Sequence, residues 1–232
     1  IKTISSKADV KNTTLDPIKL GYHLKKLKKQ NIDNVILEAS SHGLKQNRLD
    51  GLNFNTALFT NLSHDHLDYH KNFKNYLNAK LYLFKKLLSK NSNIITDIAI
   101  PEYKKIKKIS LKKKLNLKTI GFEKGDLSIV NHEYINEKQI IKIKYKNNFY
   151  IIKTNLIGKI QIKNLLMAMI AAEKSNVNFK NIANVISKLK PVNGRLEKIG
   201  KIRNNSKVIL DYAHTPDALK TCLQNLKDQF RN

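Results

Sequence analysis

Side chains able to do chemistry gather at three places, and the first is the segment EASSHGLKQNR, residues 38–48. Glu38 comes near the end of a short apolar run, residues 34–40, which we expect to be a buried strand. A carboxylate in such a place needs a cation or hydrogen-bond donors, so a divalent metal is a candidate partner. The polar residues 40–43 (SSHG) offer donors to an anionic or sugar-bearing ligand. A capped turn would account for the same residues without any ligand.

The second cluster is TNLSHDHLDYH, residues 60–70, which holds three histidines and two aspartates after another apolar run. Its HDHxDxxH spacing matches no single metal geometry, and neutral imidazoles suit a zinc site, a magnesium shell or a phosphate. Further along, Lys80 lies in a mainly apolar helical pattern. Such a lysine either extends its amine to the surface or is held in a site, and the pattern alone favours the surface.

The third cluster is DYAHTPDAL, residues 211–219, at a predicted junction between a strand and a helix. Exposed N–H groups and the dipole at a helix start favour anions, so Asp211 and His214 are candidates for nucleotide contact. Helix capping by Thr215, with a proline at the first helical position, explains part of the same motif.

The elements that must position these clusters follow an α/β pattern in the first half of the chain. Apolar periodicity predicts helices over 17–30 and 73–88, and short apolar runs predict buried strands over 34–40, 56–62 and 93–97. The carboxyl ends of parallel strands share one edge of a sheet, where ligands collect. We therefore expect Glu38, His66 and Lys80 to converge on one surface.

The second half of the chain changes character. Four segments separated by turn signals are predicted to form β-hairpins, and two helices follow them. A break in the pattern at 191–194 predicts a domain boundary, which we place between residues 192 and 193. Beyond it a strand and a helix open a second α/β unit. The hairpin strands are 117–122, 127–135, 139–145 and 149–154; a surface helix or loop is expected over 104–114, helices over 161–174, 179–189 and 216–230, and a strand over 207–211.

Composition limits the partners and the setting. The 232 residues carry 44 lysines and arginines against 18 aspartates and glutamates, for a net charge of +26. Only four of the basic residues are arginines, whereas nucleic-acid recognition favours the bidentate arginine fork, so we attribute the excess mainly to lysine-rich composition and expect no specific nucleic-acid partner. The single cysteine, Cys222, excludes an internal disulfide and fits a cytoplasmic setting. No apolar run is long enough to predict a membrane span.

Taken together, five motifs in this order resemble the Mur ligase family, and within it the members that add the third residue of the peptidoglycan stem peptide. The motifs are EASSHGLKQNRLDG, FTNLSHDHLDYHKNFKNYLNAKLYLF, LIGKIQIKNLLMAM, PVNGRLE and LDYAHTPDAL, and the resemblance runs from Asn12 to Phe230. It implies an α/β central ATPase domain over 1–192, a mostly parallel sheet with antiparallel hairpins, and the start of a Rossmann-like C-terminal domain over 193–232.

The resemblance also implies a reaction and its residues. In the family, ATP phosphorylates the carboxylate of UDP-MurNAc-L-Ala-D-Glu and an amino acid attacks the acyl phosphate, with Mg²⁺ offsetting charge. The added amino acid is either meso-diaminopimelate or L-lysine, and we expect a monomer. By resemblance Glu38, His66 and Lys80 are catalytic and hold magnesium, with Lys80 carbamylated by carbon dioxide; the substrate contacts are Thr13, Thr14, Ser40, Gln46 and Arg48, and the nucleotide contacts Asn164, Arg195, Asp211 and His214.

The sequence also departs from the family pattern. No G-x-x-G-K-[ST] phosphate loop occurs in the 232 residues, and neither does the Asp-Asn-Pro-Arg-like motif that selects the amino acid. We therefore expect a fragment that lacks the P-loop and is inactive alone. Another ligase of the superfamily, such as a cyanophycin or folylpolyglutamate synthetase, is the alternative enzyme, although the SSHGL motif argues against it. A basic nucleic-acid-binding module is the alternative outside enzymes.

Overall fold

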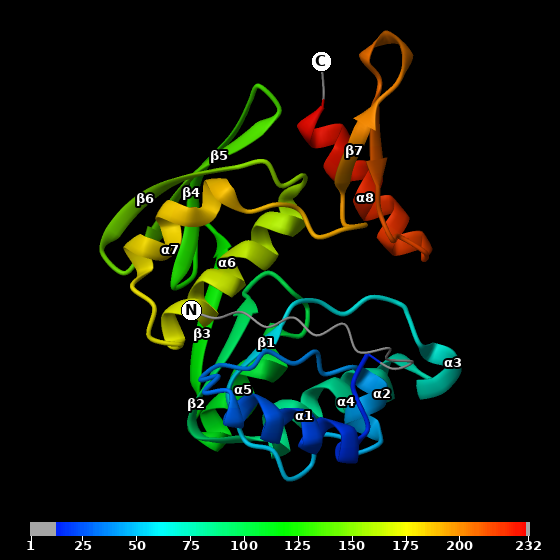
Figure 1. Cartoon of the computed structure of the whole chain (residues 1–232), viewed down its shortest axis with the longest axis vertical. Helices are drawn as coiled ribbons and strands as arrows, with labels where there is room; N and C mark the ends of the chain where they lie inside the picture. The colour runs from blue at the N-terminus through cyan, green and yellow to red at the C-terminus, as the bar shows by residue number, and fades with distance from the viewer. Residues whose placement is uncertain (1–12, 231–232) are drawn as a thin grey trace.

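The computed structural model describes residues 13–230, so Asn12 lies outside the described residues. A six-stranded sheet runs in the order β1-β2-β3-β4-β5-β6, and a separate two-stranded sheet pairs β7 with β8 (Figure 1). The strands are β1 (Phe54–Phe59), β2 (Leu88–Asp97), β3 (Asn116–Phe122), β4 (Leu127–Ile135), β5 (Lys138–Tyr145), β6 (Asn148–Thr154), β7 (Glu197–Lys201) and β8 (Lys207–Leu210).

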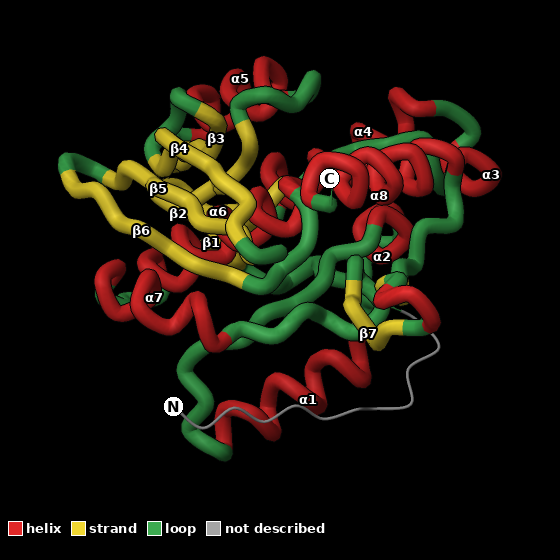
Figure 2. Tube along the Cα trace, turned by 90° about the horizontal axis from the view of Figure 1, so that it is seen from above, coloured by secondary structure: helices red, strands yellow, loops and turns green. Residues whose placement is uncertain are grey.

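Helices cover both faces of the large sheet, with α5 and α7 on opposite sides of the strands (Figure 2). The helices are α1 (Pro17–Lys29), α2 (Ser41–Lys45), α3 (Leu67–His70), α4 (Phe73–Lys86), α5 (Tyr103–Lys113), α6 (Lys159–Lys174), α7 (Phe179–Val185) and α8 (Pro216–Gln229), with two single 3-10 turns, η1 (Ile186–Lys188) and η2 (Arg203–Asn205). Among the described residues, no helix combines the length and the apolar character that crossing a membrane requires.

Alternation along β2 divides the core into two clusters. Ile94 packs with the residues of α4 and α5, whereas its neighbour Ile95 packs with those of α6 and α7. Both side chains are fully buried, because successive residues of a strand point to opposite faces and here a helical layer covers each face. The prediction of an α/β fold with a mostly parallel sheet is confirmed.

The antiparallel hairpins are confirmed for β4-β5-β6 but wrong for the strand before them. Asn136 and Glu137 both adopt positive φ, 49° and 66°, as a tight two-residue hairpin turn between β4 and β5 requires. Strands β3 and β4, however, pair in parallel. The loop between them turns the chain twice, and Asp126 fixes it by accepting hydrogen bonds from the backbone N–H and the hydroxyl of Thr119 at 2.9 and 2.7 Å.

The strand expected over residues 34–40 is wrong. The structure leaves this segment outside both sheets, with Ile36 97% exposed. A β-branched run becomes a strand only where a second backbone supplies hydrogen bonds, and within residues 13–230 none pairs with it. Glu38 is therefore exposed, and it lies on a segment without regular secondary structure instead of at the end of a buried strand.

The first helix forms where its period predicts, but with a different buried face. The spacing of Ile18 and Tyr22 puts them on the same apolar side as Leu24 and Leu27, yet they are 86% and 67% exposed, while Leu20 is buried. Leu24 and Leu27 are half-buried with Leu20, so the predicted side is correct for these two leucines and wrong for Ile18 and Tyr22. The sequence pattern also did not predict α2, α3 or β7, which are all of five residues or fewer.

Candidate active site

A network of short hydrogen bonds around Thr14 organises the SSHG segment. The Thr14 hydroxyl donates to the Glu38 carbonyl at 2.8 Å and accepts from the Ser40 N–H at 2.9 Å. Ser40 in turn caps α2, because its hydroxyl accepts from the Gly43 N–H at 3.1 Å. A Cβ at Gly43 would fall 2.7 Å from the Cβ of Thr14, so this position requires glycine. The capped turn is thus present, and it places two predicted substrate residues in contact.

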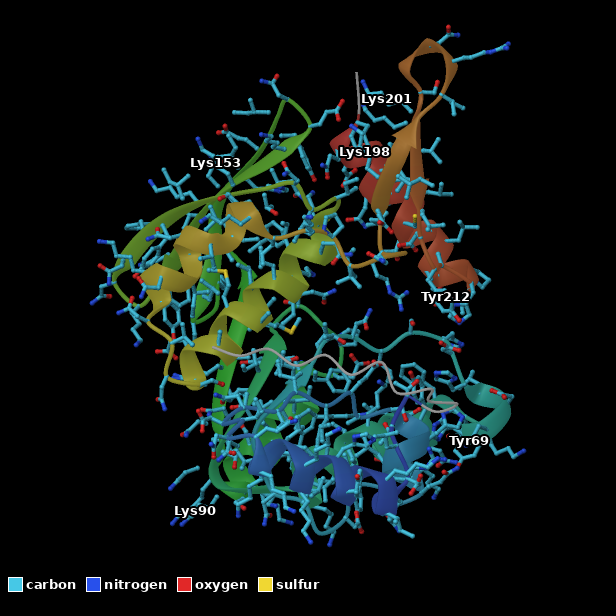
Figure 3. All side chains as sticks on the ribbon, in the orientation of Figure 1. Tyr69, Lys90, Lys153, Lys198, Lys201 and Tyr212 are labelled. Carbon is cyan, nitrogen blue, oxygen red and sulfur yellow. The ribbon has the colours of Figure 1, made fainter. Side chains whose placement is uncertain are left out.

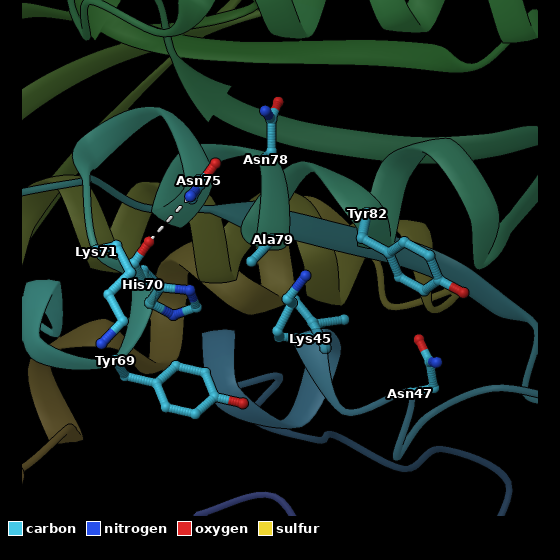
Figure 4. Close-up of a pocket in the computed structure, with 10 residues that line it drawn as sticks. Lys45, Asn47, Tyr69, His70, Lys71, Asn75, Asn78, Ala79 and Tyr82 are labelled. Carbon is cyan, nitrogen blue, oxygen red and sulfur yellow. Dashed lines mark hydrogen bonds between the residues drawn. The ribbon is translucent and has the colours of Figure 1, made fainter.

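Two further predicted substrate residues lie at the other end of α2. Arg48 donates from Nη1 to the Thr14 carbonyl at 2.8 Å, and Gln46 donates to the Tyr69 hydroxyl at 3.1 Å. Tyr69 helps to line a cavity of about 590 Å³ between α2, α3 and α4, drawn in Figure 4. Thr13 is exposed beside Thr14. Three of the five predicted substrate contacts, Thr14, Ser40 and Arg48, are therefore joined through this network, and Gln46 lies beside it at the end of α2.

The histidines of the second cluster pack around α2 and α4. His42 and His66 stand edge to face with ring centroids 4.9 Å apart, and His70 stacks on Tyr76 at 5.1 Å. His70 is 4% exposed and hydrogen-bonded to the Ser41 hydroxyl at 3.0 Å. Burial lowers the pKa of both His42 and His70. His70 is consequently a packed structural histidine, whereas the side chain of His66 is 44% exposed.

Lys80 is partly buried, and two carboxylates lie near enough to act on its charge. Its amine lies 5.5 Å from the centre of the Tyr76 ring, one helical turn earlier on α4, and His66 meets the same ring at 5.9 Å. Burial lowers the pKa of Lys80 below its ordinary value of 10.5, while the carboxylates of Glu38 and then Asp65 act in the opposite direction. The structure thus places Lys80 and His66 against one tyrosine ring, within electrostatic reach of Glu38, and it leaves Lys80 partly buried instead of fully extended to the surface.

Asp65 is the residue of this site that the sequence interpretation did not single out. Its carboxylate accepts from the His66 N–H at 2.8 Å and lies 3.6 Å from the His66 ring nitrogen Nδ1. It also lies 3.8 Å from Nε2 of His214, a residue that follows β8 in the sequence. The signal was available, because Asp65 sits inside the HDH motif, but nothing in the spacing says which of two aspartates faces the lysine.

The predicted nucleotide residues form a second group near the start of α6. Arg195 is exposed, stacks on Tyr212 at 5.0 Å, and its carbonyl accepts from Gln161 one turn before Asn164. Asn164 is exposed on α6. Asp211 uses both carboxylate oxygens on backbone N–H groups, of Leu196 at 2.8 Å and Ala213 at 2.9 Å. Asp211 therefore fixes the loop that carries Arg195, and only His214 reaches the first group.

Comparison with known proteins identifies this arrangement. Residues 1–172 match the Mur ligase middle domain, and residues 194–232 match the Mur ligase glutamate ligase domain. The chain belongs to the Mur ligase family. The predicted resemblance is confirmed, while the domain boundary between residues 192 and 193 stays a prediction.

Several Mur ligase relatives are similar along nearly the whole chain. It is 39% identical to the UDP-N-acetylmuramoyl-L-alanyl-D-glutamate--2,6-diaminopimelate ligase of Rickettsia bellii over 93% of its length, and 39% identical to the ligase of the same name from Wigglesworthia glossinidia brevipalpis over 95%. A solved structure with that name superposes with a TM-score of 0.79 at 29% identity, covering 94% of this chain and 45% of the other. The chain spans 44–45% of the two relatives' lengths.

The Mur ligase family implies magnesium, and the residues around Lys80 fit it only in part. No group of three or more histidine, cysteine, aspartate or glutamate side chains in the described part of the chain is arranged to hold a metal. Glu38 supplies an oxygen ligand and His66 a nitrogen, and magnesium prefers oxygen.

Proposed function

We propose that this chain is the central part of an ATP-dependent amide ligase that adds the third amino acid to UDP-MurNAc-L-Ala-D-Glu. The names of its relatives favour 2,6-diaminopimelate over L-lysine as that amino acid. The observation that carries the proposal is the placement of Lys80 and His66 against the same Tyr76 ring, where the carboxylates of Glu38 and Asp65 act on the charge of the lysine. A monomer and a cytoplasmic setting stay predictions.

The reaction has two steps. The terminal phosphoryl group of ATP passes to the free carboxylate of the dipeptide, giving an acyl phosphate and ADP. The amine of the incoming amino acid then attacks the acyl carbon, loses a proton and expels phosphate, so an amide forms. Magnesium, when bound, offsets the negative charge on the transferring phosphoryl group. The chain must therefore hold two anionic substrates in line and keep their charges compensated.

Lys80 supports the proposal through its burial. A neutral amine, unlike an ammonium ion, attacks carbon dioxide, and the depressed pKa of Lys80 increases the neutral fraction. The product is a carbamate, which changes the side chain from a cation to an anion next to Glu38 and His66. Carbamylated Lys80, Glu38 and His66 would then hold the ion.

The remaining candidates bind and orient the two substrates. Arg48 is suited to a substrate carboxylate or phosphate, and Gln46, Ser40, Thr13 and Thr14 lie around the same α2 turn. Asn164, Arg195, Asp211 and His214 form the proposed nucleotide side. The contact between His214 and Asp65 joins the two sides, so the acceptor carboxylate and the phosphoryl donor have a common meeting point near Lys80.

Ligation is tested on the 232-residue chain and on the same chain joined to the flanking segments of its Wigglesworthia glossinidia relative. The chain alone lacks a phosphate loop in its sequence, so we expect neither ATP hydrolysis nor tripeptide formation from it. The chimera is expected to form UDP-MurNAc-tripeptide with magnesium and diaminopimelate. A folded chimera that binds UDP-MurNAc-L-Ala-D-Glu but never ligates, beside an active relative, would contradict the proposal.

Carbamylation is tested separately on the chain itself. With carbon-13 bicarbonate we expect one carbamate resonance that disappears in Lys80→Ala and persists in Lys74→Ala, a change of an exposed lysine on the same helix. Lys80→Glu in the chimera is expected to recover part of the activity that Lys80→Ala loses. A bicarbonate-independent wild type, with equal loss in both variants, would rule out the modification.

A further inference from the structure

Helix α6, which carries Asn164, begins without a side-chain cap of its own. Its N-cap residue is Gly158, which is buried and has a φ of 82°. The first N–H groups of a helix have no partner inside the helix, and leaving them unpaired in a buried place is costly. A side chain from elsewhere must therefore complete this helix start.

Two side chains of α8 do so. Gln229 accepts from the Gly158 N–H at 2.8 Å, and Asn225 accepts from the Ile160 N–H at 3.2 Å. Asn225 is 8% and Gln229 6% exposed, so these contacts are shielded from water. A Cβ at Gly158 would fall 2.6 Å from Oδ1 of Asn225, which shows how closely α8 approaches the start of α6.

The donor groups of the same two amides are also used. Gln229 donates from Nε2 to the Glu137 carbonyl in the β4–β5 turn at 2.9 Å, and Asn225 donates to the Thr221 carbonyl within α8 at 2.7 Å. Their orientation is therefore fixed, with the oxygen toward α6. Figure 1 shows α8 lying beside the start of α6 and near the β4–β5 hairpin.

Ion pairs hold the surrounding elements in the same arrangement. Glu137 pairs with Lys198 of β7 at 2.8 Å and Lys207 of β8 at 3.0 Å, and Lys159 of α6 lies 3.6 Å from Asp228 of α8. The helix start, the hairpin turn and the two-stranded unit thus meet at one junction. A movement of the two-stranded unit with α8 would remove the caps from α6.

We infer that Asn225 and Gln229 are positioning residues, which couple the placement of the unit containing β7, β8 and α8 to helix α6 and so to Asn164. The part of this inference that concerns nucleotide binding rests on the proposed function, whereas the part that concerns the capping of α6 does not. The coupling is direct, because the acceptors that complete α6 belong to the helix that follows the DYAHTP motif. The nucleotide side of the site would then be complete only while α8 is docked.

The structural arm measures amide hydrogen exchange in the 232-residue chain by nuclear magnetic resonance. Asn225→Leu keeps the size but removes the acceptor, and we expect the Ile160 N–H to exchange about tenfold faster, as loss of a helix cap predicts. Asn225→Asp keeps an acceptor oxygen and is expected to restore protection. Lys220→Ala, an exposed change on the same helix, is the matched control and should leave exchange unchanged.

Unchanged Ile160 exchange in a folded Asn225→Leu chain would overturn the inference. If that variant does not fold, we measure hydrogen exchange of the Gly158 N–H in Gln229→Met, and unchanged exchange there would overturn the inference in the same way.

The nucleotide arm titrates the same chains with magnesium and ADP and follows the Asn164 amide resonance. We expect Asn225→Leu to weaken binding about threefold and Asn225→Asp to recover it. Faster exchange with wild-type ADP affinity in Asn225→Leu would overturn the positioning role. A wild-type chain that shows no response to ADP would count against the proposed nucleotide site instead, and the exchange data then decide the capping alone.

Discussion

The amine of Lys163 lies 2.6 Å from Oδ2 of Asp97, and this ion pair ties α6 to the carboxyl end of β2. Asp97 is 1% exposed, and its other carboxylate oxygen accepts from the Ala99 N–H at 2.8 Å. Lys163 directly precedes Asn164 in α6. The helix that carries a proposed nucleotide residue is therefore fixed at its start by α8 and one turn later by the sheet.

Removing the lysine of this pair should destabilise the chain strongly. Lys163→Met leaves the Asp97 carboxylate buried without its cation, and we expect a loss of about 3 kcal/mol in the free energy of unfolding. Adding Asp97→Asn to Lys163→Met should restore most of the lost free energy of unfolding, because the neutral amide needs no cation. Urea unfolding measures both variants, with the exposed Lys180→Met as control. Equal stability of Lys163→Met and the control would contradict this reasoning.

The junction at Glu137 should weaken in acid. Hydrogen bonds from Lys198 and Lys207 lower the pKa of Glu137 from 4.5 to about 2. A carboxyl group with a lowered pKa in the folded state stabilises the fold above its unfolded pKa and loses that contribution as pH falls through the folded value.

We therefore expect the stability difference between wild type and Glu137→Gln to be full above about pH 4.5 and to vanish towards pH 2. Thermal unfolding across this range measures it, and high salt should reduce the difference, since the group is exposed. A difference that stays constant over the range would show that the ion pairs contribute nothing.

Gly43→Ala should disturb the Thr14 network. The added Cβ would lie 2.7 Å from the Thr14 Cβ, so the chain must shift, at a cost of about 1–3 kcal/mol. Gly21→Ala is the matched control: nothing lies within 4 Å of its Cβ position in α1, and alanine there should stabilise the helix by about 1 kcal/mol. Chemical denaturation of both variants checks this, and a neutral Gly43→Ala would argue against the close approach.

The positive charge should give only weak, salt-sensitive contact with nucleic acid. Lys90, Lys153 and Lys198 lie in separate parts of the molecule in Figure 3, as expected if the lysine excess follows composition. Counterion release makes such binding fall steeply with salt. A gel-shift titration at physiological salt should show no tight complex, and length-dependent nanomolar binding to DNA would refute the compositional explanation.

The sequence by itself determined the types of the longer elements and the family, and it supplied the candidate residues of the site apart from Asp65. Long periodic segments such as α4 and α6 form helices as predicted. Their apolar residues recur at helical spacing, so a helix gathers them on one side that can be buried against any neighbouring element. By resemblance the motifs predict Glu38, His66 and Lys80 as one site, because the first motif contains Glu38 and the second contains both His66 and Lys80.

Only the tertiary structure decided what depends on partners distant in sequence. Residues 34–40 have the composition of a strand but find no paired backbone among residues 13–230, and β3 pairs with β4 in parallel through a turn that the sequence pattern does not reveal. The environment of Lys80, the contact between Asp65 and His214, and the capping of α6 likewise join segments that are distant in sequence; Ile160 and the Asn225 that caps it are 65 positions apart. Local spacing fixes which face a side chain takes on its own element, whereas burial and hydrogen-bond partners are set by the elements that pack against it.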